Sequence, residues 1–389
     1  MIIAVPKETK SFENRVALTP DITKQLIKAG MTIRIESGAG ERASFNNQNY
    51  IDAGAEIIPN AKDLYANTDV ILKVNAPSVS EAEMLKEGSV LISFLYAYTI
   101  PDVIEILEKR KIQTFSMDAV PRITRAQKMD ALSSQTNLAG YKAVLMAANA
   151  SGKIFPMMST AAGTITPAKV LIFGAGVAGL QAIATAKRLG AVVEVTDVRP
   201  ETKEQVESLG GRFLEVPNTP EGINDAVKTE GGYAKEVSKE FLEKQKTLIR
   251  QRIKEADIVI TTALVPGKKA PVLVTEDMVE SMKTGAVIVD MAVEWGGNCE
   301  LSRKDETVTT HGVTIIGVSN LPALLPVNSS ELYARNISTL LLHLVNENGF
   351  KWEMEEEITK GSLITHNGEL VHAFTKGILE KMNSQVLSK

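Results

Sequence analysis

The chain has 389 residues, of which 44% are hydrophobic, and its 43 basic and 47 acidic side chains give a net charge of −4. This length predicts two or three domains that each bury a core, and the mild charge, with no long basic run, argues against nucleic-acid binding. The single cysteine, Cys299, excludes an internal disulfide and is typical of a reducing compartment. The N-terminus has no signal-peptide core, and no apolar run approaches the roughly 20 residues that cross a bilayer. We therefore expect a soluble protein without a transmembrane segment of its own.

The N-terminal third of the chain alternates between short apolar runs and helical segments, which predicts a doubly wound α/β sheet. We expect its strands at residues 2–5, 31–36, 70–74, 90–95 and 114–117. Thr19 followed by Pro20 is typical of a helix N-cap and first turn, and Gly30 is typical of the end of that helix.

Three basic residues, Lys7, Arg15 and Lys73, follow strands of this first sheet. The carboxyl ends of the strands line the ligand crevice in open α/β sheets, so these side chains could form the basic edge of a pocket. The spacing fits equally well with exposed charges that bridge loops, and the sequence leaves both interpretations open.

A polar stretch at residues 122–144 precedes the second sheet. Gln127, Asp130, Ser133 and Asn137 follow one another at intervals of three, three and four, so in a helix they would share one face. Such a face is usually solvated. This stripe is nearly uncharged, however, whereas solvated faces tend to be rich in Lys and Glu, and that difference favours a binding role.

A dinucleotide-binding βαβ pattern occupies residues 169–199. A buried strand at 170–173 is followed by Gly174, Gly176 and Gly179 in the G-x-G-x-x-G spacing, and then by a helix at 180–189 and a strand at 191–195. Gly174 allows the tight turn, Gly176 lets a pyrophosphate approach the backbone, and Gly179 lets the helix pack on its strand. The helix N-terminus offers free N–H groups and the positive end of its dipole to the phosphates.

Asp197 ends the second strand of this unit, about 20 residues after the glycines, where a carboxylate can accept hydrogen bonds from a ribose diol. It also repels a 2′-phosphate, so the site favours NAD(H) over NADP(H). The neighbouring Arg199 is open to two interpretations, a partner for a 2′-phosphate or a solvated charge at the end of the strand.

The remaining chain continues the alternation. We expect helices at 202–209, 236–255 and 330–346, strands at 213–216, 258–263, 286–290 and 313–317, and a hairpin turn at His366, Asn367 and Gly368. Residues 218–233 are polar and Gly-rich and read either as a mobile lid over a site or as a plain solvent loop. The four histidines lie late in the chain and do not cluster, which makes a structural zinc site or a Ser-His-Asp triad improbable.

The chain resembles the soluble NAD(H)-binding component, the separate alpha-chain piece, of proton-translocating NAD(P) transhydrogenases. The resemblance covers essentially the whole sequence and is carried by VPKE, ENRVALTP, PRITRAQKMDALSSQTNLAGYKAV, FPMMSTAAGTI, GAGVAGLQAIATAKRLGA, TDVR, TKEQVESLGG, GGYAKE, TTALVPGKKAP and VEWGGNC. The RAQxMDxLSSQ run is the most discriminating, because alanine dehydrogenases belong to the same wider family and share the first and last of these motifs.

The resemblance implies two doubly wound, Rossmann-like α/β domains with a cleft between them, the first made of residues 1–138 and 321–389 and the second, NAD(H)-binding domain of residues 139–320. It implies direct hydride transfer from NADH, bound here as a substrate, to NADP⁺ on a partner subunit, with no metal and with proton translocation in membrane subunits. It further implies a homodimer that lies on the cytoplasmic face of the inner membrane through those subunits.

The family's site is carried over by position. Arg122, Gln127 and Asp130 are implied as catalytic residues, and with Ser133 they surround the nicotinamide and its ribose. The other implied contacts to the dinucleotide are Gly174, Gly176, Val177, Gly179, Asp197, Val198, Arg199, Gly232, Tyr233, Gln245 and Leu264.

Two alternatives remain, an alanine dehydrogenase and a non-catalytic NAD-sensing module. Alanine dehydrogenases resemble this chain at Arg15 and Lys73, which in that family hold the substrate, and their catalytic Asp aligns with Glu294. They also need a catalytic His in the loop that here reads Phe-Leu-Tyr-Ala-Tyr at residues 94–98. Without that acid–base group, proton exchange with an amino or keto acid loses its natural catalyst, which favours the transhydrogenase.

Overall fold

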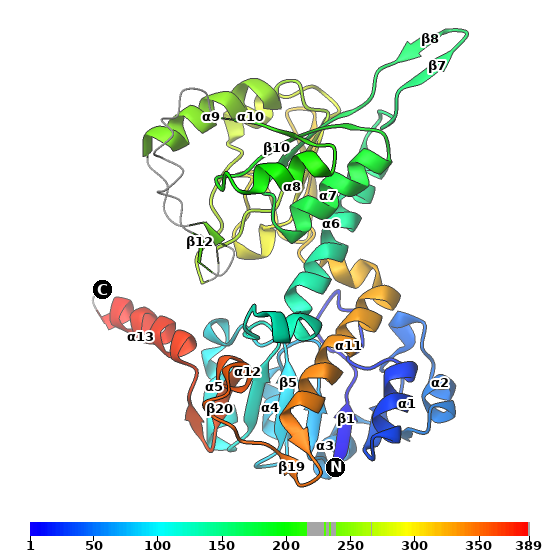
Figure 1. Cartoon of the computed structure of the whole chain (residues 1–389), viewed down its shortest axis with the longest axis vertical. Coiled ribbons are helices and arrows are strands. Elements are labelled where there is room, and N and C mark those ends of the chain that lie inside the picture. Colours follow the sequence, from blue (N-terminus) through cyan, green and yellow to red (C-terminus); the bar gives the residue numbers. More distant parts are fainter. Residues whose placement is uncertain (216–228, 231–232, 235–238, 266, 388–389) are drawn as a thin grey trace. The chain divides into compact units, whose positions relative to one another are not determined.

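The computed structural model of this chain describes residues 1–215, 229–230, 233–234, 239–265 and 267–387 (Figure 1). The chain divides into two compact units, Met1–Gln135 with Ala323–Lys389 and Thr136–Pro322, so that the first unit is discontinuous in sequence. Helix α6 (Ala131–Ala150) runs through the division between residues 135 and 136.

The first unit contains an eight-stranded sheet in the order β21-β20-β6-β5-β4-β1-β2-β3. Its strands are β1 (Ile2–Val5), β2 (Thr32–Glu36), β3 (Glu56–Ile58), β4 (Val70–Leu72), β5 (Val90–Ser93), β6 (Gln113–Ser116), β20 (Leu363–His366) and β21 (Glu369–Leu370). Strands β1 to β6 run parallel, whereas β20 and β21 are antiparallel additions at one edge. The order of β1 to β6 is that of a doubly wound sheet, which confirms the predicted fold class for this unit.

Helices surround this sheet on both faces. They are α1 (Pro20–Lys28), α2 (Asn47–Asp52), α3 (Ala61–Ala66), α4 (Val79–Met84), α5 (Pro101–Lys109), α11 (Pro326–Leu344), α12 (Glu357–Ser362) and α13 (Ala373–Leu387), with short 3-10 turns η1 (Glu41–Ala43), η2 (Ala97–Thr99) and η3 (Thr124–Met129) and a hairpin of β18 (Val345–Asn346) and β19 (Gly349–Phe350). Helix α1 begins at Pro20 as predicted, although the Thr19 side chain makes no capping hydrogen bond.

The turn between β20 and β21 is the predicted hairpin. Asn367 and Gly368 have φ angles of 51° and 86°, and two successive residues in this left-handed region characterise the tight two-residue turn that Asn-Gly favours.

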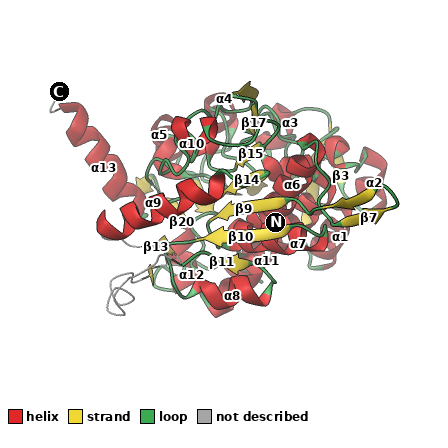
Figure 2. Cartoon of the chain, turned by 90° about the horizontal axis from the view of Figure 1, so that it is seen from above, coloured by secondary structure: helices red, strands yellow, loops and turns green. Residues whose placement is uncertain are grey.

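The second unit is built on a sheet of seven described strands in the order β11-β10-β9-β14-β15-β17-β16 (Figure 2). They are β9 (Lys169–Phe173), β10 (Val192–Thr196), β11 (Arg212–Phe213), β14 (Ile258–Thr261), β15 (Val287–Asp290), β16 (Thr307–Thr310) and β17 (Val313–Ile316). The chain order reverses between β9 and β14, where Ile172 pairs with Val195 on one side and Ile260 on the other. Open α/β sheets bind ligands outside the carboxyl ends of the strands at such a reversal.

Alternate side chains of β9 enter two different cores, because successive residues of a strand point to opposite faces. Val170 and Ile172 pack in the cluster that includes α6 and α7 (Val177–Arg188). Leu171 and Phe173 pack in the cluster that includes α9 (Lys239–Ile253) and α10 (Glu276–Glu280). Burying each such side chain contributes about 1.5–3 kcal/mol, so the glycine turn that follows β9 starts from a firmly held strand.

The other described elements of the second unit are α8 (Thr202–Ser208), the 3-10 turn η5 (Val293–Trp295) and two small hairpins, and the 3-10 turn η6 (Leu321–Leu324) runs through its end at Pro322. One hairpin pairs β7 (Met158–Thr160) with β8 (Gly163–Ile165), and the other pairs β12 (Thr229–Glu230) with β13 (Tyr233–Ala234). Most of the loop predicted at 218–233, as a lid or as a plain solvent loop, lies outside the described residues.

Candidate functional site

The glycine turn of the second unit has the backbone that its residue types allow. Gly174 has a φ of +97°, in the region that favours glycine, and its N–H donates to the carbonyl of Thr196 at 2.8 Å. A Cβ on Gly174 would lie 2.5 Å from Oγ1 of Thr262, and a Cβ on Gly179 would lie 1.8 Å from the carbonyl oxygen of Gly174. Thr262, which lies in the TTALVPGKKAP motif but was assigned no role from the sequence, holds this turn by donating to the carbonyl of Phe173 at 2.9 Å.

Among the residues that the structure describes, little crowds Gly176. A Cβ at this position would meet one atom within 4 Å, Nη2 of Arg199 at 3.9 Å. Gly176 is also the N-cap of α7, and no side chain caps this helix, so the N–H groups of its first turn, which begins at Val177, make no capping hydrogen bond. An uncapped helix N-terminus beside open space is suited to a phosphate group.

The carboxylate of Asp197 already has four protein donors. Its Oδ1 accepts from the backbone N–H of Arg199 at 2.8 Å and from Nε of Arg199 at 2.9 Å. Its Oδ2 accepts from the backbone N–H of Ala175 at 2.7 Å and from Nη2 of Arg199 at 2.8 Å. Asp197 thus ties the glycine turn to the end of β10 in addition to any contact with a ribose.

The structure contradicts one of the two interpretations of Arg199, that of a solvated charge at the end of the strand. The guanidinium makes a bidentate ion pair with Asp197, and the two side chains are 16% and 5% exposed, so Arg199 is not a solvated charge. The guanidinium faces the Asp197 carboxylate through two of its nitrogens.

The other residues of this unit that the family resemblance implies differ in burial and in their contacts. Gln245 on α9 is buried and donates to Oγ1 of Thr196 at 3.1 Å, next to Asp197 in the chain. Val198 follows Asp197 directly and is half-buried, and Leu264 is exposed two residues after Thr262. Tyr233 lies in β13, whereas Gly232 lies outside the described residues.

In the Arg122–Ser133 segment of the first unit, exposed polar side chains alternate with buried apolar side chains that hold the backbone in place. Arg122 and Gln127 are exposed, whereas Ala126 and Met129 are buried in the core of this unit. A 3-10 turn, η3, therefore displays Gln127 to the outside.

The expectation of one helical face for the four polar residues is wrong. Helix α6 starts only at Ala131, because Asp130 leaves the helical conformation with ψ 82°. Its carboxylate caps α6, since Oδ1 accepts from the N–H of Ser133 at 2.8 Å and Oδ2 accepts from the hydroxyl of Ser133 at 2.6 Å. The structure brings Asp130 and Ser133 together and places Gln127 on the preceding turn.

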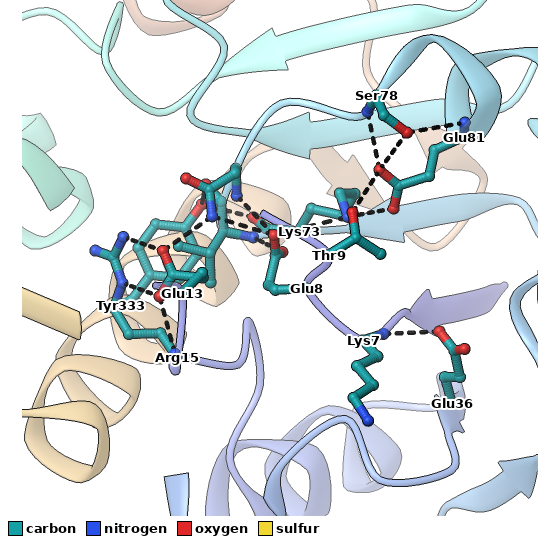
Figure 3. A network of polar contacts seen from close by, with 12 residues as sticks. Lys7, Glu8, Thr9, Glu13, Arg15, Glu36, Lys73, Ser78, Glu81 and Tyr333 are labelled. Atoms are coloured by element: carbon teal, nitrogen blue, oxygen red, sulfur yellow. Dashed lines mark hydrogen bonds and ion pairs between the residues drawn. The ribbon is translucent and has the colours of Figure 1, made fainter. Parts of the chain in front are cut away.

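Arg15 and Lys73 are buried inside the first unit, and each is paired with a carboxylate (Figure 3). Nε and Nη2 of Arg15 lie 2.8 and 2.6 Å from the two carboxylate oxygens of Glu13. Nζ of Lys73 lies 2.8 Å from Oε1 of Glu81 and 3.7 Å from Oε2 of Glu8. Lys7 makes a different contact, its backbone N–H donating to Glu36 at 2.8 Å.

For Arg15 and Lys73, these contacts overturn both sequence interpretations. Arg15 and Lys73 form neither a basic pocket edge nor exposed charges, because folding supplies three carboxylates to two cations. Asn75 joins the two pairs by donating to Oε2 of Glu8 at 3.1 Å and to Oε2 of Glu13 at 2.9 Å.

The buried pairs shift the acidities of their members. Burial alone would raise the pKa of Glu13, but the Arg15 guanidinium lowers it to about 2. For Glu8 burial prevails and its pKa is raised, even though Lys73 acts in the opposite direction. Glu13 is therefore a firmly ionised partner of Arg15, whereas ionised Glu8 is a costly one.

Metal ligands and membrane-spanning helices are both missing from the residues that the structure describes. These residues contain no group of three or more His, Cys, Asp or Glu side chains placed to hold a metal ion. None of their helices is long and apolar enough to cross a membrane.

Comparison with known proteins identifies the family. Residues 4–139 match the model "Alanine dehydrogenase/PNT, N-terminal domain", and residues 143–373 match "Alanine dehydrogenase/PNT, C-terminal domain". The chain is 48% identical over 384 residues to the first of the chains that make up the NAD(P) transhydrogenase subunit alpha of Rhodospirillum rubrum, covering 97% of this chain and 99% of that one. It is 32% identical over 400 residues to alanine dehydrogenase 2 of Staphylococcus aureus, covering 100% of this chain and 98% of that one.

A solved structure supports the same placement. A transhydrogenase from Sinorhizobium meliloti superposes with a TM-score of 0.86 at 43% identity, over 95% of this chain and 100% of that one. The chain thus belongs to the alanine dehydrogenase/PNT family and, within it, to the NAD(P) transhydrogenase alpha subunits.

Proposed function

We propose that this chain binds NAD(H) as a substrate and exchanges a hydride directly with NADP(H) bound on a partner subunit. The observation that carries the proposal is the open space over Gly176 at the uncapped start of α7, which suits a dinucleotide pyrophosphate. Membership of the transhydrogenase alpha subunits supports an NAD(H)-binding role at this place.

The proposed site assigns each part of the nucleotide to named groups. Gly174, Gly176, Val177 and Gly179 bind the pyrophosphate, and Asp197, Val198 and Arg199 bind the adenosine ribose. Arg122, Gln127, Asp130 and Ser133 orient the nicotinamide and its ribose, and Gly232, Tyr233, Gln245 and Leu264 complete the site.

The proposed reaction needs no acid or base from the protein. A hydride leaves C4 of the dihydronicotinamide of NADH and bonds to C4 of the oxidised nicotinamide of NADP⁺, so NADH becomes NAD⁺ and NADP⁺ becomes NADPH. The contribution of this chain is orientation and electrostatics. Gln127 is assigned to orienting the ring, and Arg122 and Asp130 to holding its amide and ribose.

The proposal includes partners. The NADP(H)-binding domain of the beta subunit supplies the second nicotinamide, and membrane subunits couple the transfer to proton translocation and hold this chain on the cytoplasmic face of the inner membrane. A homodimer is also proposed. The β7–β8 hairpin supports it, since Met157, Met158 and Ile165 are exposed apolar side chains that a second copy can cover.

Alanine oxidation by this chain alone is disfavoured by the pairs in Figure 3. A substrate carboxylate bound by Arg15 or Lys73 would have to replace Glu13 or Glu81, which already bind these cations in the interior. Such a replacement costs several kcal/mol, because the displaced glutamate carboxylate is left in the interior without its cation.

One experiment separates the three functions. The purified chain is mixed with an isolated NADP(H)-binding transhydrogenase domain, and oxidation of NADH by an NADP⁺ analogue is followed. Alanine oxidation with NAD⁺ is then assayed without the partner. Fast transfer without alanine turnover is the expected result, alanine turnover alone identifies an alanine dehydrogenase, and NADH binding with neither activity identifies a sensing module.

A further inference from the structure

The backbone leaves the helical conformation at Asp130, between the end of η3 and the start of α6, and we call this interruption the Asp130 break. Asn336 of helix α11 has a buried side-chain amide that contacts one residue before the Asp130 break and one after it. Its side chain is 8% exposed. Its Nδ2 donates to the backbone carbonyl of Lys128 at 2.9 Å, and its Oδ1 accepts from the hydroxyl of Ser134 at 2.7 Å.

The two contacted residues bracket the residues assigned to the nicotinamide. Lys128 lies in η3, directly after Gln127, and Ser134 lies in the first turn of α6, directly after Ser133. Between them the backbone leaves the helical conformation at Asp130. A planar amide has its donor and acceptor at a fixed separation, so Asn336 fixes how far apart the end of η3 and the start of α6 can lie.

Other polar contacts to η3 are weaker constraints. Arg125 makes ion pairs with Glu356 at 3.4 Å and with Glu357 at 3.6 Å, but the Arg125 side chain is 63% exposed. Exposed ion pairs of this kind contribute little and hold their side chains loosely. The buried hydrogen bonds of Asn336, on a helix that packs against η3, are the more rigid connection.

We propose that Asn336 is a positioning residue for hydride transfer, which sets the Asp130 break and thereby the place at which Gln127 meets the nicotinamide. The inference rests on the proposed function, because that function assigns Gln127 and Asp130 to the ring. It adds a residue of α11 that touches no part of the nucleotide itself.

The test compares Asn336→Leu with Ser338→Ala in the full chain. Leu keeps a similar volume but removes both hydrogen bonds of Asn336, the one to the Lys128 carbonyl and the one from the Ser134 hydroxyl, which keeps its bond to the carbonyl of Ala131. Ser338 is the matched control, because it is buried on the same helix and its hydroxyl bonds within that helix, to the carbonyl of Arg335. Both variants are measured for thermal midpoint, NADH dissociation constant and single-turnover hydride transfer to the partner domain at saturating NADH.

We expect Asn336→Leu to slow transfer by about tenfold or more, since a misplacement of about 1 Å can cost a hundredfold. Its NADH dissociation constant should change by less than roughly threefold, because a residue acting on the transition-state geometry alters rate more than binding. Ser338→Ala should keep the rate of the unmodified chain. Equal rates for the two variants, or rate losses that follow the thermal midpoint in both, would overturn the proposal.

A second variant covers a failure of Asn336→Leu to fold. Ser134→Ala removes only one of the two hydrogen bonds of Asn336 and should slow transfer by a smaller factor, with NADH binding retained. An unchanged rate in Ser134→Ala would count against the positioning role. If instead the unmodified chain transfers no hydride to the partner domain, the proposed function itself fails. This outcome differs from a failure of the positioning role, in which the unmodified chain and the variants transfer hydride equally fast.

Discussion

Gln127 combines an exposed amide with a firmly held backbone, because Ala126 and Met129 on either side of its turn are buried. Gln127→Asn keeps the amide but shortens its reach by one methylene. We expect hydride transfer to slow strongly, by about tenfold or more, with NADH affinity little changed, since orientation and not attraction is altered.

Single-turnover kinetics with the partner domain and a fluorescence titration of NADH measure the two quantities. Gln48→Asn is the matched control, because Gln48 is an exposed glutamine of α2 that bonds to Asp52 in the same helix region. A parallel loss of NADH binding in Gln127→Asn, or an unchanged rate, would remove Gln127 from the mechanism.

Two of the buried carboxylates, Glu13 and Glu8, should respond differently to pH. The pKa of Glu13 is about 2 in the folded chain against 4.5 for an ordinary glutamate, so its stabilising effect is complete above pH 4.5 and is lost as the pH falls toward 2. Glu13→Gln should lower the free energy of unfolding at pH 7 by about 3–5 kcal/mol, because Arg15 is left buried and unpaired. The difference from the unmodified chain should narrow below pH 4.5.

Glu8 supplies the opposite case. Its pKa is raised by burial, so it favours the folded state most at low pH and this contribution is lost as the pH rises through its folded pKa. Glu8→Gln should therefore be neutral or stabilising at pH 7 to 8, with a smaller difference near pH 4. Urea unfolding across this range measures both variants, and similar losses for the two at pH 7 would contradict the assignment.

At the scale of elements, the glycine turn allows a matched pair of substitutions. A Cβ on Gly179 would lie 1.8 Å from the carbonyl oxygen of Gly174, whereas a Cβ on Gly176 would come no closer than 3.9 Å to a described atom, Nη2 of Arg199. Gly179→Ala should lower the thermal midpoint and weaken NADH binding together, because α7 must move away from the turn. Gly176→Ala should keep the thermal midpoint and still raise the NADH dissociation constant, by roughly tenfold, since its methyl group lies where the pyrophosphate approaches.

Calorimetry and NADH titration of the two variants decide this point. Unchanged NADH affinity in Gly176→Ala would mean that the phosphates lie elsewhere. An unchanged thermal midpoint in Gly179→Ala would mean that the helix does not depend on this close approach.

The sequence predicted the elements whose information is local. The β9–α7–β10 unit and the turn at Asn367 and Gly368 were confirmed, because apolar runs, glycines and turn residues act on their own neighbours. The break at Asp130 was missed, since an Asp at a helical interval is equally suited to a helix face or to an N-cap. The antiparallel edge strand β16 was missed as well, because Thr307–Thr310 is a short polar run.

The site residues that depend on local sequence could likewise be predicted, whereas their tertiary partners could not. Gly174 and Gly179 could be assigned from spacing, but the carboxylates on Arg15 and Lys73 could not. Glu81 reaches Lys73 only after α4 packs beside β4, and Glu13 is one of several acidic residues near Arg15 in the sequence. Partners chosen by tertiary packing leave no periodic pattern in the chain.

At the scale of the whole molecule, substitutions in the β7–β8 hairpin test the proposed homodimer. Met157 is 66% exposed, and Met158 and Ile165 are exposed on the paired strands. Charged replacements, Met158→Asp with Ile165→Asp, should convert a dimer into a monomer, because two buried charges at an interface cost several kcal/mol. Sedimentation velocity measures the change.

The control pair for this experiment is Ile51→Asp with Val79→Asp, two exposed apolar residues of the first unit. It should leave the sedimentation of the chain unchanged. A monomeric unmodified chain, or a dimer that survives the hairpin substitutions, would contradict this part of the proposal.

The ion pair of Asp197 and Arg199 makes nucleotide binding an exchange reaction. The four hydrogen bonds to the Asp197 oxygens come from the chain itself, so a ribose hydroxyl that donates to Asp197 in the proposed site competes with these donors, two of which are side-chain nitrogens of Arg199. A released guanidinium attracts a counter-anion from solution. The measured NADH affinity should consequently depend on the identity of the buffer anion as well as on ionic strength, because the salt is then a participant in the binding equilibrium.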